Sequence, residues 1–490
     1  MGTQAAADGE GRSGSGKKAG HAVNTSLRRA VATVTVCAAG LAGALVTHPA
    51  ADAARHPSRA HAASSGPALK KTDLGYKATV YGTKVLLDGV EVRNAKTAFA
   101  QQRCTRYVGR EVTRGADITD LGIPLVAGGL TESYSRTYQK GGVRGVRGVS
   151  TIGDLELGGE FQGQQTPTLK LQGLTSVADS FRKADGTFGH DESFGFEGLS
   201  IGNLPEQIPQ ELQDLLDLIS QGSADLVNQV IDLLSSVTGN TIDIPGLGSI
   251  GLAGVKSGRT TAHSASSQTY ALRVTVTATG HPTEITLGRA HSAVYEPVPA
   301  GVFQSRAMGM ALLGGNDLVS LGGLEEQSLP CSGSNGKVQK HSIADVRVLG
   351  GLVNMTGVQY ALMGDQTRAG AARGFVSTTI GSLSVPSLNL VIDGITSRVD
   401  LRKPAGTTKV ERTVRTGIAK ITLNGEEIAV PTKAGQVVDL GDGNFLKYRV
   451  LSRNNWTGVE TRALTLTLPG LIPGGSVLDL AWAGGHISPN

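Results

Sequence analysis

Alternating apolar and polar positions recur along most of this chain. In residues 271–277, ALRVTVT, every second residue is apolar, and residues 463–469, ALTLTLP, show the same alternation. A period of two is typical of strands that turn one face to a core and the other to water. Turns rich in Gly and Pro follow both segments, and turns this short favour antiparallel pairing. The pattern predicts antiparallel sheets whose apolar faces need cover, as in a β-sandwich.

The chain also contains an internal repeat. The two alternating segments lie 192 positions apart, and so do the ends of the similar stretches 150–158, STIGDLELG, and 342–350, SIADVRVLG. A shift of 227 superposes two earlier pairs, Gly82 with Gly309 and Cys104 with Cys331. Repeats of this kind fix an architecture. On this alignment, the first copy holds 35 extra residues (227 minus 192) between its cysteine and its Gly-Gly pair.

Residues 208–237 break the β pattern. Leucine, isoleucine and valine recur there at helical spacing on either side of Gly222, with Ser223 and Gly239 as candidate caps of the second helix. The polar face carries aspartates and no Lys or Arg, which argues against binding to an anionic membrane. We expect a helical hairpin over one end of the β core, with a partner-binding element as the alternative.

These patterns give the expected organisation. We predict a mainly β protein of two related antiparallel β-sandwich-like modules, the first with an inserted α-helical hairpin. The expected segments are a signal peptide and leader (1–62), a linker (63–74), module 1 (75–294) with its helical insertion near 205–239, a Pro-rich linker (295–302), and module 2 (303–490).

The first 62 residues indicate export. Lys17, Lys18, Arg28 and Arg29 precede the uncharged run 30–47, and small-residue cleavage motifs follow at 51–53, ADA, and 60–62, AHA. A retained signal anchor and a later translation start are the alternatives. The net charge of +5 comes mostly from this leader, because 39 basic and 38 acidic residues remain without it. Global charge therefore gives no argument for a nucleic acid or membrane partner.

Two cysteines remain once the leader is removed. Cys104 and Cys331 occupy equivalent positions of the two copies, and an isolated pair in an oxidising compartment suggests a disulfide. Equivalent residues meet if the copies pack about a pseudo-twofold axis. Two separate buried thiols, one in each core, are the alternative.

Basic residues concentrate in one part of the first copy. The candidate for binding a polyanion such as a cell-wall polymer consists of Arg136, Lys140, Arg144 and Arg147, in and around the sequence KGGVRGVRG. Acidic neighbours and the glycines favour an exposed mobile loop as the alternative.

Motifs for metal or nucleophilic chemistry are weak. Strand alternation sends His190 and Glu192 to the same side, but two ligands do not make a metal site. Asp442-Gly443 resembles a hairpin turn more than a calcium loop. We expect no metal, no cofactor and no assignable catalytic residue. Paired acids such as Asp154, Asp191 or Asp345 are the features on which a hydrolase hypothesis rests.

The second copy resembles a known family. Residues 345–365, DVRVLGGLVNMTGVQYALMGD, the hairpin KITLNGEEIAV and the closing segment ALTLTLPGLIPGGSVLDLAWAGGHI are similar to the choice-of-anchor P family of secreted actinobacterial proteins. The resemblance implies export and no catalytic residues. We expect a secreted or envelope-associated, non-enzymatic structural or adhesive protein, with a cell-wall polymer or another surface protein as its partner. The alternative is a secreted hydrolase acting on polysaccharide or peptide.

Overall fold

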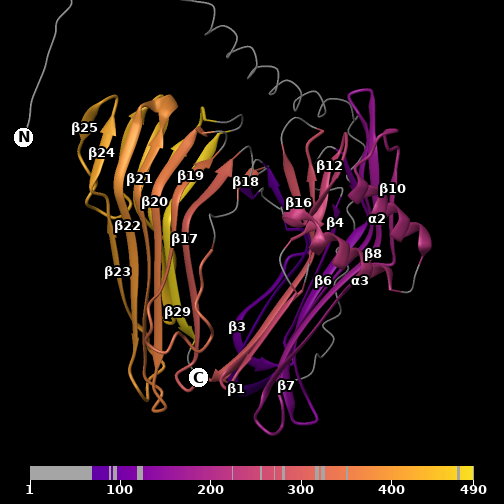
Figure 1. The fold of residues 1–490 in the computed structure, drawn as a ribbon. Helices are drawn as coiled ribbons and strands as arrows, with labels where there is room; N and C mark the ends of the chain where they lie inside the picture. Colours follow the sequence, from indigo (N-terminus) through magenta and orange to yellow (C-terminus); the bar gives the residue numbers. More distant parts are fainter. Residues whose placement is uncertain are drawn as a thin grey trace, which may run out of the picture. The chain divides into compact units, whose positions relative to one another are not determined.

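A computed structural model of the chain describes residues 69–490 apart from twelve short segments. These are 88–89, 92–95, 119–124, 223–224, 254–255, 270, 279–281, 315–318, 322–325, 349–350, 472–474 and 489–490. The predicted leader and the first half of the first predicted linker, residues 63–68, lie outside the described residues. The described chain folds into four antiparallel sheets, which form two modules, and into a pair of helices (Figure 1). The prediction of a mainly β fold is confirmed.

Module 1 contains sheets A and B. Sheet A has the order β11 (Thr241–Ile244), β12 (Gly248–Leu252), β15 (Leu272–Val276), β16 (Thr283–Pro297), β1 (Lys70–Leu87) and β2 (Val90–Glu91), while β3 (Ala100–Val108) pairs with β1, β14 (Ser264–Gln268) with β16, and β13 (Ser257–Thr261) with β14. Sheet B has the order β10 (Gly198–Gly202), β8 (Gln164–Arg182), β7 (Val143–Phe161), β6 (Leu130–Lys140) and β4 (Glu111–Asp117), while β5 (Val126–Gly128) pairs with β7 and β9 (Phe188–Gly195) with β8.

Module 2 contains sheets C and D. Sheet C has the order β18 (Val319–Leu321), β17 (Val302–Gly314), β29 (Ser476–Ser488), β28 (Gly458–Leu468), β27 (Asn444–Asn455) and β26 (Val437–Gly441). Sheet D has the order β19 (Gln339–Val348), β20 (Val353–Gln366), β21 (Ala372–Val385), β22 (Leu390–Lys403), β24 (Lys420–Leu423) and β25 (Glu426–Ile428), while β23 (Glu411–Gly417) pairs with β22.

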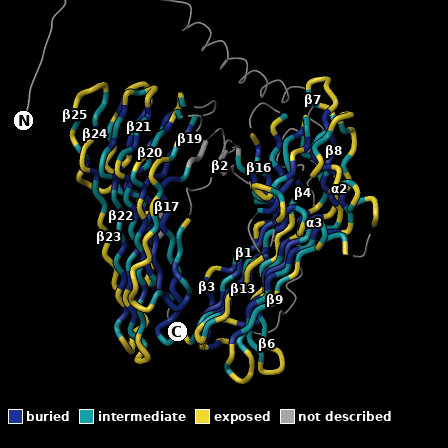
Figure 2. The backbone as a smooth tube through the Cα atoms, viewed as in Figure 1, coloured by how far each residue is buried: buried dark blue, intermediate teal, exposed yellow. Residues whose placement is uncertain are grey.

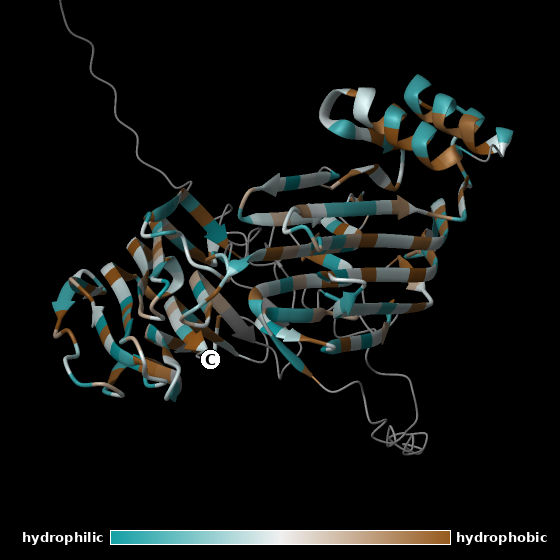
Figure 3. Cartoon of the chain, turned by 90° about the horizontal axis from the view of Figure 1, so that it is seen from below, coloured by the Kyte–Doolittle hydropathy of each residue, from teal (hydrophilic) through white to brown (hydrophobic). Residues whose placement is uncertain are grey.

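Each module buries its own core between its two sheets. In module 1, Leu157 and Leu174 of sheet B share a buried cluster with Ile285 of sheet A. In module 2, Ile380 of sheet D shares a cluster with Leu466 of sheet C. Buried and exposed positions alternate along the strands (Figure 2), as do apolar and polar residues (Figure 3). The alternation in the sequence thus sets which face of each sheet is covered.

The terminal halves of the two modules have the same topology. The order β12-β15-β16-β1-β2 in sheet A corresponds to β27-β28-β29-β17-β18 in sheet C. The same irregularity also recurs, since the pairing of β1 with β16 skips Gly82 and Gly288, and the pairing of β17 with β29 skips Gly309 and Ala481. Gly288 and Ala481 both have positive φ, of 66° and 48°. The shift of 227 is therefore a structural equivalence between β1 and β17, and the shift of 192 is one between β15 and β28. Between β16 and β29 the shift is 193.

The predicted match of residues 150–158 to 342–350 is wrong. The first stretch lies on β7 inside sheet B, and the described part of the second lies on β19 at the edge of sheet D. By strand order β7 corresponds to β21 and β8 corresponds to β22. The pairing registers make Ile152 of module 1 equivalent to Ile380 of module 2. The difference in residue number between equivalent positions is therefore 228 at Ile152, close to the 227 found at the cysteines. The extra residues of module 1 therefore lie after Ile152. They lengthen the β7–β8 hairpin and form the segment that holds the helices.

The two helices occupy the predicted insertion. Helix α2 (Gln210–Gln221) ends at Gly222, which is left-handed with φ 57°, and α3 (Leu226–Ser236) follows. Leu212 and Leu215 of α2 and Val230 and Leu234 of α3 are buried in the larger core of module 1. The hairpin therefore covers that core with its apolar stripes (Figure 3). The candidate cap Ser223 lies outside the described residues, and Gly239 lies in a 3₁₀ turn, η2 (Thr238–Asn240), after α3. A second such turn, η4 (Pro386–Leu388), joins β21 to β22.

Both predicted linkers contain ordered strand in their described parts. Strand β1 begins at Lys70, and Leu74 is fully buried, so module 1 starts before residue 75. Strand β16 runs to Pro297 and β17 starts at Val302. The connection between the modules is therefore residues 298–301, in which Val298 and Ala300 are fully buried. The expectation of an extended Pro-rich spacer over 295–302 is corrected to a short buried turn.

Two predicted hairpin turns are confirmed. Asn424 and Gly425 join β24 to β25, and Asp442 and Gly443 join β26 to β27, all four with positive φ. This conformation matches the twist of antiparallel strands, which explains the preference for Asn-Gly and Asp-Gly. The loose calcium-loop pattern around Asp442 is thus a turn.

Candidate functional site

A disulfide joins the two modules. Cys104 of β3 and Cys331, in the turn that precedes β19, are bonded with a Cα–Cα distance of 5.4 Å. The pair forms a small apolar cluster with Val298 and Val302 of the connection. The prediction of a bridge between equivalent cysteines is confirmed, and the alternative of two separate thiols is wrong.

The chain around the disulfide is packed closely. A side chain on Gly75 would bring its Cβ within 2.6 Å of the Cβ of Cys331, so this position of β1 has no room for one. The side-chain amide of Gln304, on β17, donates to the carbonyl oxygen of Cys104 at 2.9 Å. The two modules are therefore held by a covalent bond and by hydrogen bonds beside it.

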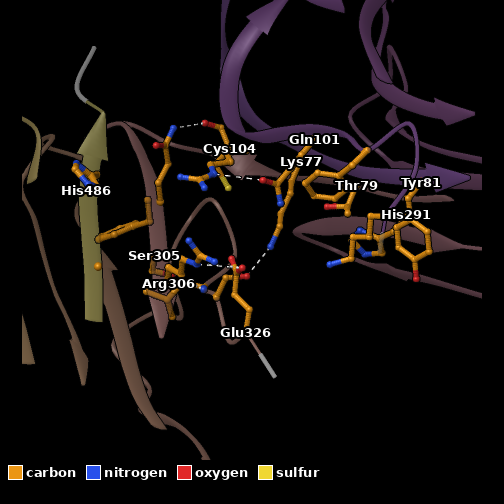
Figure 4. Close-up of a pocket in the computed structure, with 18 of the residues that line it drawn as sticks. Lys77, Thr79, Tyr81, Gln101, Cys104, His291, Ser305, Arg306, Glu326 and His486 are labelled. Atoms are coloured by element: carbon orange, nitrogen blue, oxygen red, sulfur yellow. Dashed lines mark hydrogen bonds and ion pairs between the residues drawn. The ribbon is translucent and has the colours of Figure 1, made fainter. Parts of the chain in front are cut away.

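A cavity of about 410 Å³ lies beside the disulfide and is lined by both modules (Figure 4). Module 1 contributes Lys77, Thr79 and His291, and module 2 contributes Arg306 and Glu326. The module 1 side is built by strand register. Gln101, Thr79, His291 and Gln268 form one row across β3, β1, β16 and β14.

This row lies on the face of sheet A that is turned away from the core. Ala78 and Val80, the neighbours of Thr79 along β1, are fully buried in core clusters. Because side chains alternate, Lys77, Thr79 and Tyr81 lie on the opposite face, which is the cavity side. The alternation that builds the core thus also builds the cavity.

The module 2 side uses equivalent positions. The shift of 227 that superposes the cysteines takes Thr79 to Arg306, and the same strand pairing takes His291 to Gly484 and Gln268 to Glu460. All six residues line the cavity. The two modules therefore present corresponding faces to it, as in an isologous contact between related units.

Cations outnumber anions in the lining. Arg306 pairs with Glu326 at 3.2 Å, and Arg103 pairs with Glu460 at 3.9 Å. Lys77 donates to the hydroxyl of Ser328 at 2.7 Å. Arg289 donates to the side-chain oxygen of Gln268 at 2.8 Å.

Burial changes the ionisation of two of these groups. Burial lowers the pKa of Lys77, while Glu326 acts in the opposite direction. Burial lowers the pKa of His291 to about 4, and the positive charges of Lys77 and Arg289 add to this effect. His291 is therefore neutral at neutral pH and lies close to two cations.

The four basic residues predicted to bind a polyanion do not share one face. Arg136 and Arg147 are cross-strand neighbours on β6 and β7, whereas Arg144 lies on the other face of β7 and pairs with Asp73 of β1 at 2.6 Å. Lys140 ends β6 and is exposed. These residues lie in a paired hairpin, so the alternative of an irregular loop is limited to the turn at Gly141 and Gly142.

Acidic groups accompany the two arginines that do face the same way. Across sheet B, one row runs from Glu111 through Arg136, Arg147 and Asp179 to Asp191. This row contains three carboxylates and two guanidinium groups, so its charge is balanced or negative. Binding of a polyanion there stays a prediction, without a concentration of positive charge to support it.

The predicted acids are separated. Asp154 and Asp191 face Gln172 and Asp179 of β8, seven residues apart, which is about 23 Å along a strand. Asp345 belongs to β19 of module 2. Retaining and inverting glycosidases hold their carboxyl groups about 5 to 10 Å apart. Neither Asp154 nor Asp345 forms such a pair with Asp191.

One acid pair that the sequence did not indicate lies on the same row. Asp179 and Asp191 are cross-strand partners, and the hydroxyl of Tyr138 donates to Asp179 at 2.9 Å. Burial raises the pKa of Asp179 to about 6, and the charge of Asp191 contributes in the same direction. His190 bonds to Glu192 at 2.8 Å, which confirms that the two side chains share a side.

The cavity residues could not be identified without the strand register. Lys77 and His291 look like ordinary polar positions of alternating strands, and only the pairing of β1 with β16 brings them together. The shared shift of 227 was a usable signal, since it relates Thr79 to Arg306 as it relates the cysteines.

Comparisons with family models, with curated proteins and with solved structures give no match. Within the described residues, no group of three or more His, Cys, Asp or Glu side chains is arranged to hold a metal ion. Among the helices of the described part, none has the length and apolar character needed to cross a membrane.

Proposed function

We propose that this protein is an exported, non-enzymatic structural or binding protein that works outside the cytoplasm, in the envelope or beyond it. The observation that carries the proposal is the disulfide between Cys104 and Cys331. Disulfides persist in oxidising compartments and are rare in a reducing cytosol. The basic and apolar N-terminal sequence supports the same location.

The architecture agrees with a passive role. Two sandwiches with separate cores are bonded to each other, which gives a stable unit whose outer faces are available for contact. Membership of the choice-of-anchor P family, and a cell-wall polymer or another surface protein as partner, belong to this proposal. The resemblance in module 2 supports the first point.

Fractionation tests the proposal. The full-length chain is expressed in an exporting actinobacterial host, and medium, wall and membrane fractions are analysed by mass spectrometry of non-reduced peptides. We expect a mature N-terminus near residue 54 or 63 and a linked peptide pair containing Cys104 and Cys331. An intact leader on a cytoplasmic protein with two free thiols would contradict the proposal.

A secreted hydrolase is the second candidate, and the Asp179–Asp191 pair is the observation that favours it. A carboxyl group with a raised pKa beside an ionised one is a common arrangement for acid and base roles. Hydrolysis of purified cell-wall polysaccharide that is abolished by Asp179→Asn and also by Asp191→Asn would establish this function. Equal background rates in all three proteins would exclude this pair as its catalytic site.

A further inference from the structure

The described lining of the cavity between the modules holds more cations than carboxylates. Six Lys and Arg side chains line it, of which Lys84 and Lys96 have partners of their own; the other four, Lys77, Arg103, Arg289 and Arg306, stand against two carboxylates, Glu326 and Glu460. Both carboxylates already pair with arginines, at 3.2 and 3.9 Å. The electrostatic balance of the cavity therefore favours an added anion.

The positive charge of sheet A concentrates at Lys77 and Arg289, on either side of the neutral His291. Lys77 and Arg289 donate to neutral oxygens, of Ser328 and Gln268, so these bonds do not cancel their charges. His291 lies between them in the register of β1 and β16, and both cations disfavour its protonation. Glu326 favours the charged form of Lys77, so part of this charge is already balanced. Burying the remainder is costly, and an oxyanion placed here offsets that cost.

Polar and aromatic groups surround this centre. Thr79, Gln101 and Gln268 offer hydroxyl and amide groups in the same row as His291. Tyr81 and the partly exposed ring of Phe99 line the same cavity. The volume of about 410 Å³ suits a ligand of one or two sugar rings. Amide and hydroxyl groups beside an aromatic ring fit a sugar better than an apolar molecule.

We propose that the cavity between the two modules binds an anionic sugar, a saccharide unit that carries a phosphate or carboxylate, with its oxyanion at Lys77, Arg289 and His291. Figure 4 shows Lys77 and His291 on the module 1 side and Arg306 and Glu326 on the module 2 side. This inference goes beyond the proposed function, because the site requires neither export nor any particular location of the protein.

Calorimetry with defined probes tests the proposal on the full disulfide-bonded chain. The probes are glucose 6-phosphate, glucuronate, inorganic phosphate and uncharged glucose. We expect glucose 6-phosphate and glucuronate to bind at least tenfold more tightly than glucose, with an affinity that falls as salt is added. Phosphate alone binds more weakly than glucose 6-phosphate. The proposal is overturned if glucose binds as tightly as the two anionic sugars. It is also overturned if no anion binds with a dissociation constant below about 20 mM.

Matched variants locate the site. The double substitution Lys77→Gln with Arg289→Gln is expected to lower the affinity for glucose 6-phosphate at least tenfold. Arg114→Gln with Lys170→Gln removes the same charge from sheet B of module 1, away from the cavity, and is expected to change the affinity less than twofold. An equal loss in both double variants, or a larger loss in the second, contradicts the assignment.

A measurement on the unaltered protein covers the case in which the cavity variant fails to fold. The imidazole resonances of His291 are followed by NMR while glucose 6-phosphate is added at constant ionic strength. A bound oxyanion is expected to shift these resonances in proportion to saturation, with the exposed His263 as an internal control. Saturable binding that leaves His291 unchanged places the ligand elsewhere and overturns the proposal.

Discussion

The two modules share a framework but differ in the faces that they turn to the cavity. On the module 2 side, Trp482 lies between Arg306 and Arg462, whose guanidinium groups are 4.8 and 4.4 Å from the ring centre. At the position equivalent to Trp482, module 1 has Arg289. At this position module 2 packs the ring of Trp482 between two arginines, whereas module 1 has the cation Arg289 in the lining of the cavity. Duplicated positions have thus taken different roles, one in packing against two arginines and one in lining the cavity.

The disulfide is the feature that makes this comparison possible, and removing it has the largest expected effect. Cys104→Ser with Cys331→Ser opens a loop of 227 positions. The entropic model predicts a loss of up to about 5 kcal/mol if both modules unfold together. Urea unfolding of the variant and of the reduced protein measures it. Unchanged midpoints in both samples would mean that the modules unfold independently of the bridge.

The shared bulge offers the next test. A Cβ on Gly288 would lie 2.0 Å from Cδ2 of Leu174, whereas the equivalent Ala481 already carries one. We expect Gly288→Ala to cost about 3 kcal/mol, from overpacking and a positive φ. The reverse change, Ala481→Gly, is expected to cost less than about 1 kcal/mol, because relief of φ offsets the lost methyl group. Thermal melting measures both, and equal losses would contradict the comparison.

Replacing the ring tests the packed face of module 2. Trp482→Leu removes both cation–π contacts and part of the buried area, so we expect a loss of about 2 kcal/mol. The substitution Arg289→Leu at the equivalent position of module 1 is expected to leave stability unchanged or increased, because it removes an uncompensated charge. Chemical denaturation of the two variants measures this, and a larger loss at residue 289 would reverse the assignment of roles.

The smallest effect concerns pH. Burial raises the pKa of Asp179 to about 6 from an ordinary value of 3.8, so the folded state holds this proton more tightly than the unfolded chain. Stability therefore falls as pH rises from about 4 to 6. We expect Asp179→Asn to remove this slope, worth about 1 kcal/mol after solvent screening.

Melting between pH 4 and 7 measures the slope. The equivalent residue in module 2 is Asp400, which accepts hydrogen bonds from Arg398, so Asp400→Asn is the matched substitution. A variant at residue 179 that keeps the full slope of the native protein would contradict the attribution.

Much of the framework was predictable from the sequence. Period-two alternation identified β15 and β28, the Asn-Gly and Asp-Gly pairs identified two turns, and leucine spacing identified both helices. The cysteine pairing followed from the equivalence of the copies. These features depend on local periodicity and turn chemistry, which act over a few residues.

The alignment of β7 failed for a physical reason. Gly-Gly pairs occur at many turns and bulges, so two such pairs need not be equivalent. Gly158 and Gly159 form a bulge in the pairing of β7 with β8, which is unrelated to β19. The better guide was the packed sequence around Ile152, Thr151-Ile152-Gly153, which recurs around Ile380. The cavity was not predictable, because it depends on the partners of β1 and on the connection between modules.

The ends of each module suggest how a two-copy protein arises. In module 1 the first strand pairs with the last, Leu74 with Pro297, and in module 2 Val302 pairs with Ser488. Entry and exit of the chain are thus neighbours, so a gene segment encoding one unit can be joined to a second copy by a connection as short as residues 298–301. The seam between the copies then starts as a symmetric contact. Mutations in either copy then accumulate independently, so equivalent positions such as Arg289 and Trp482 can take different roles.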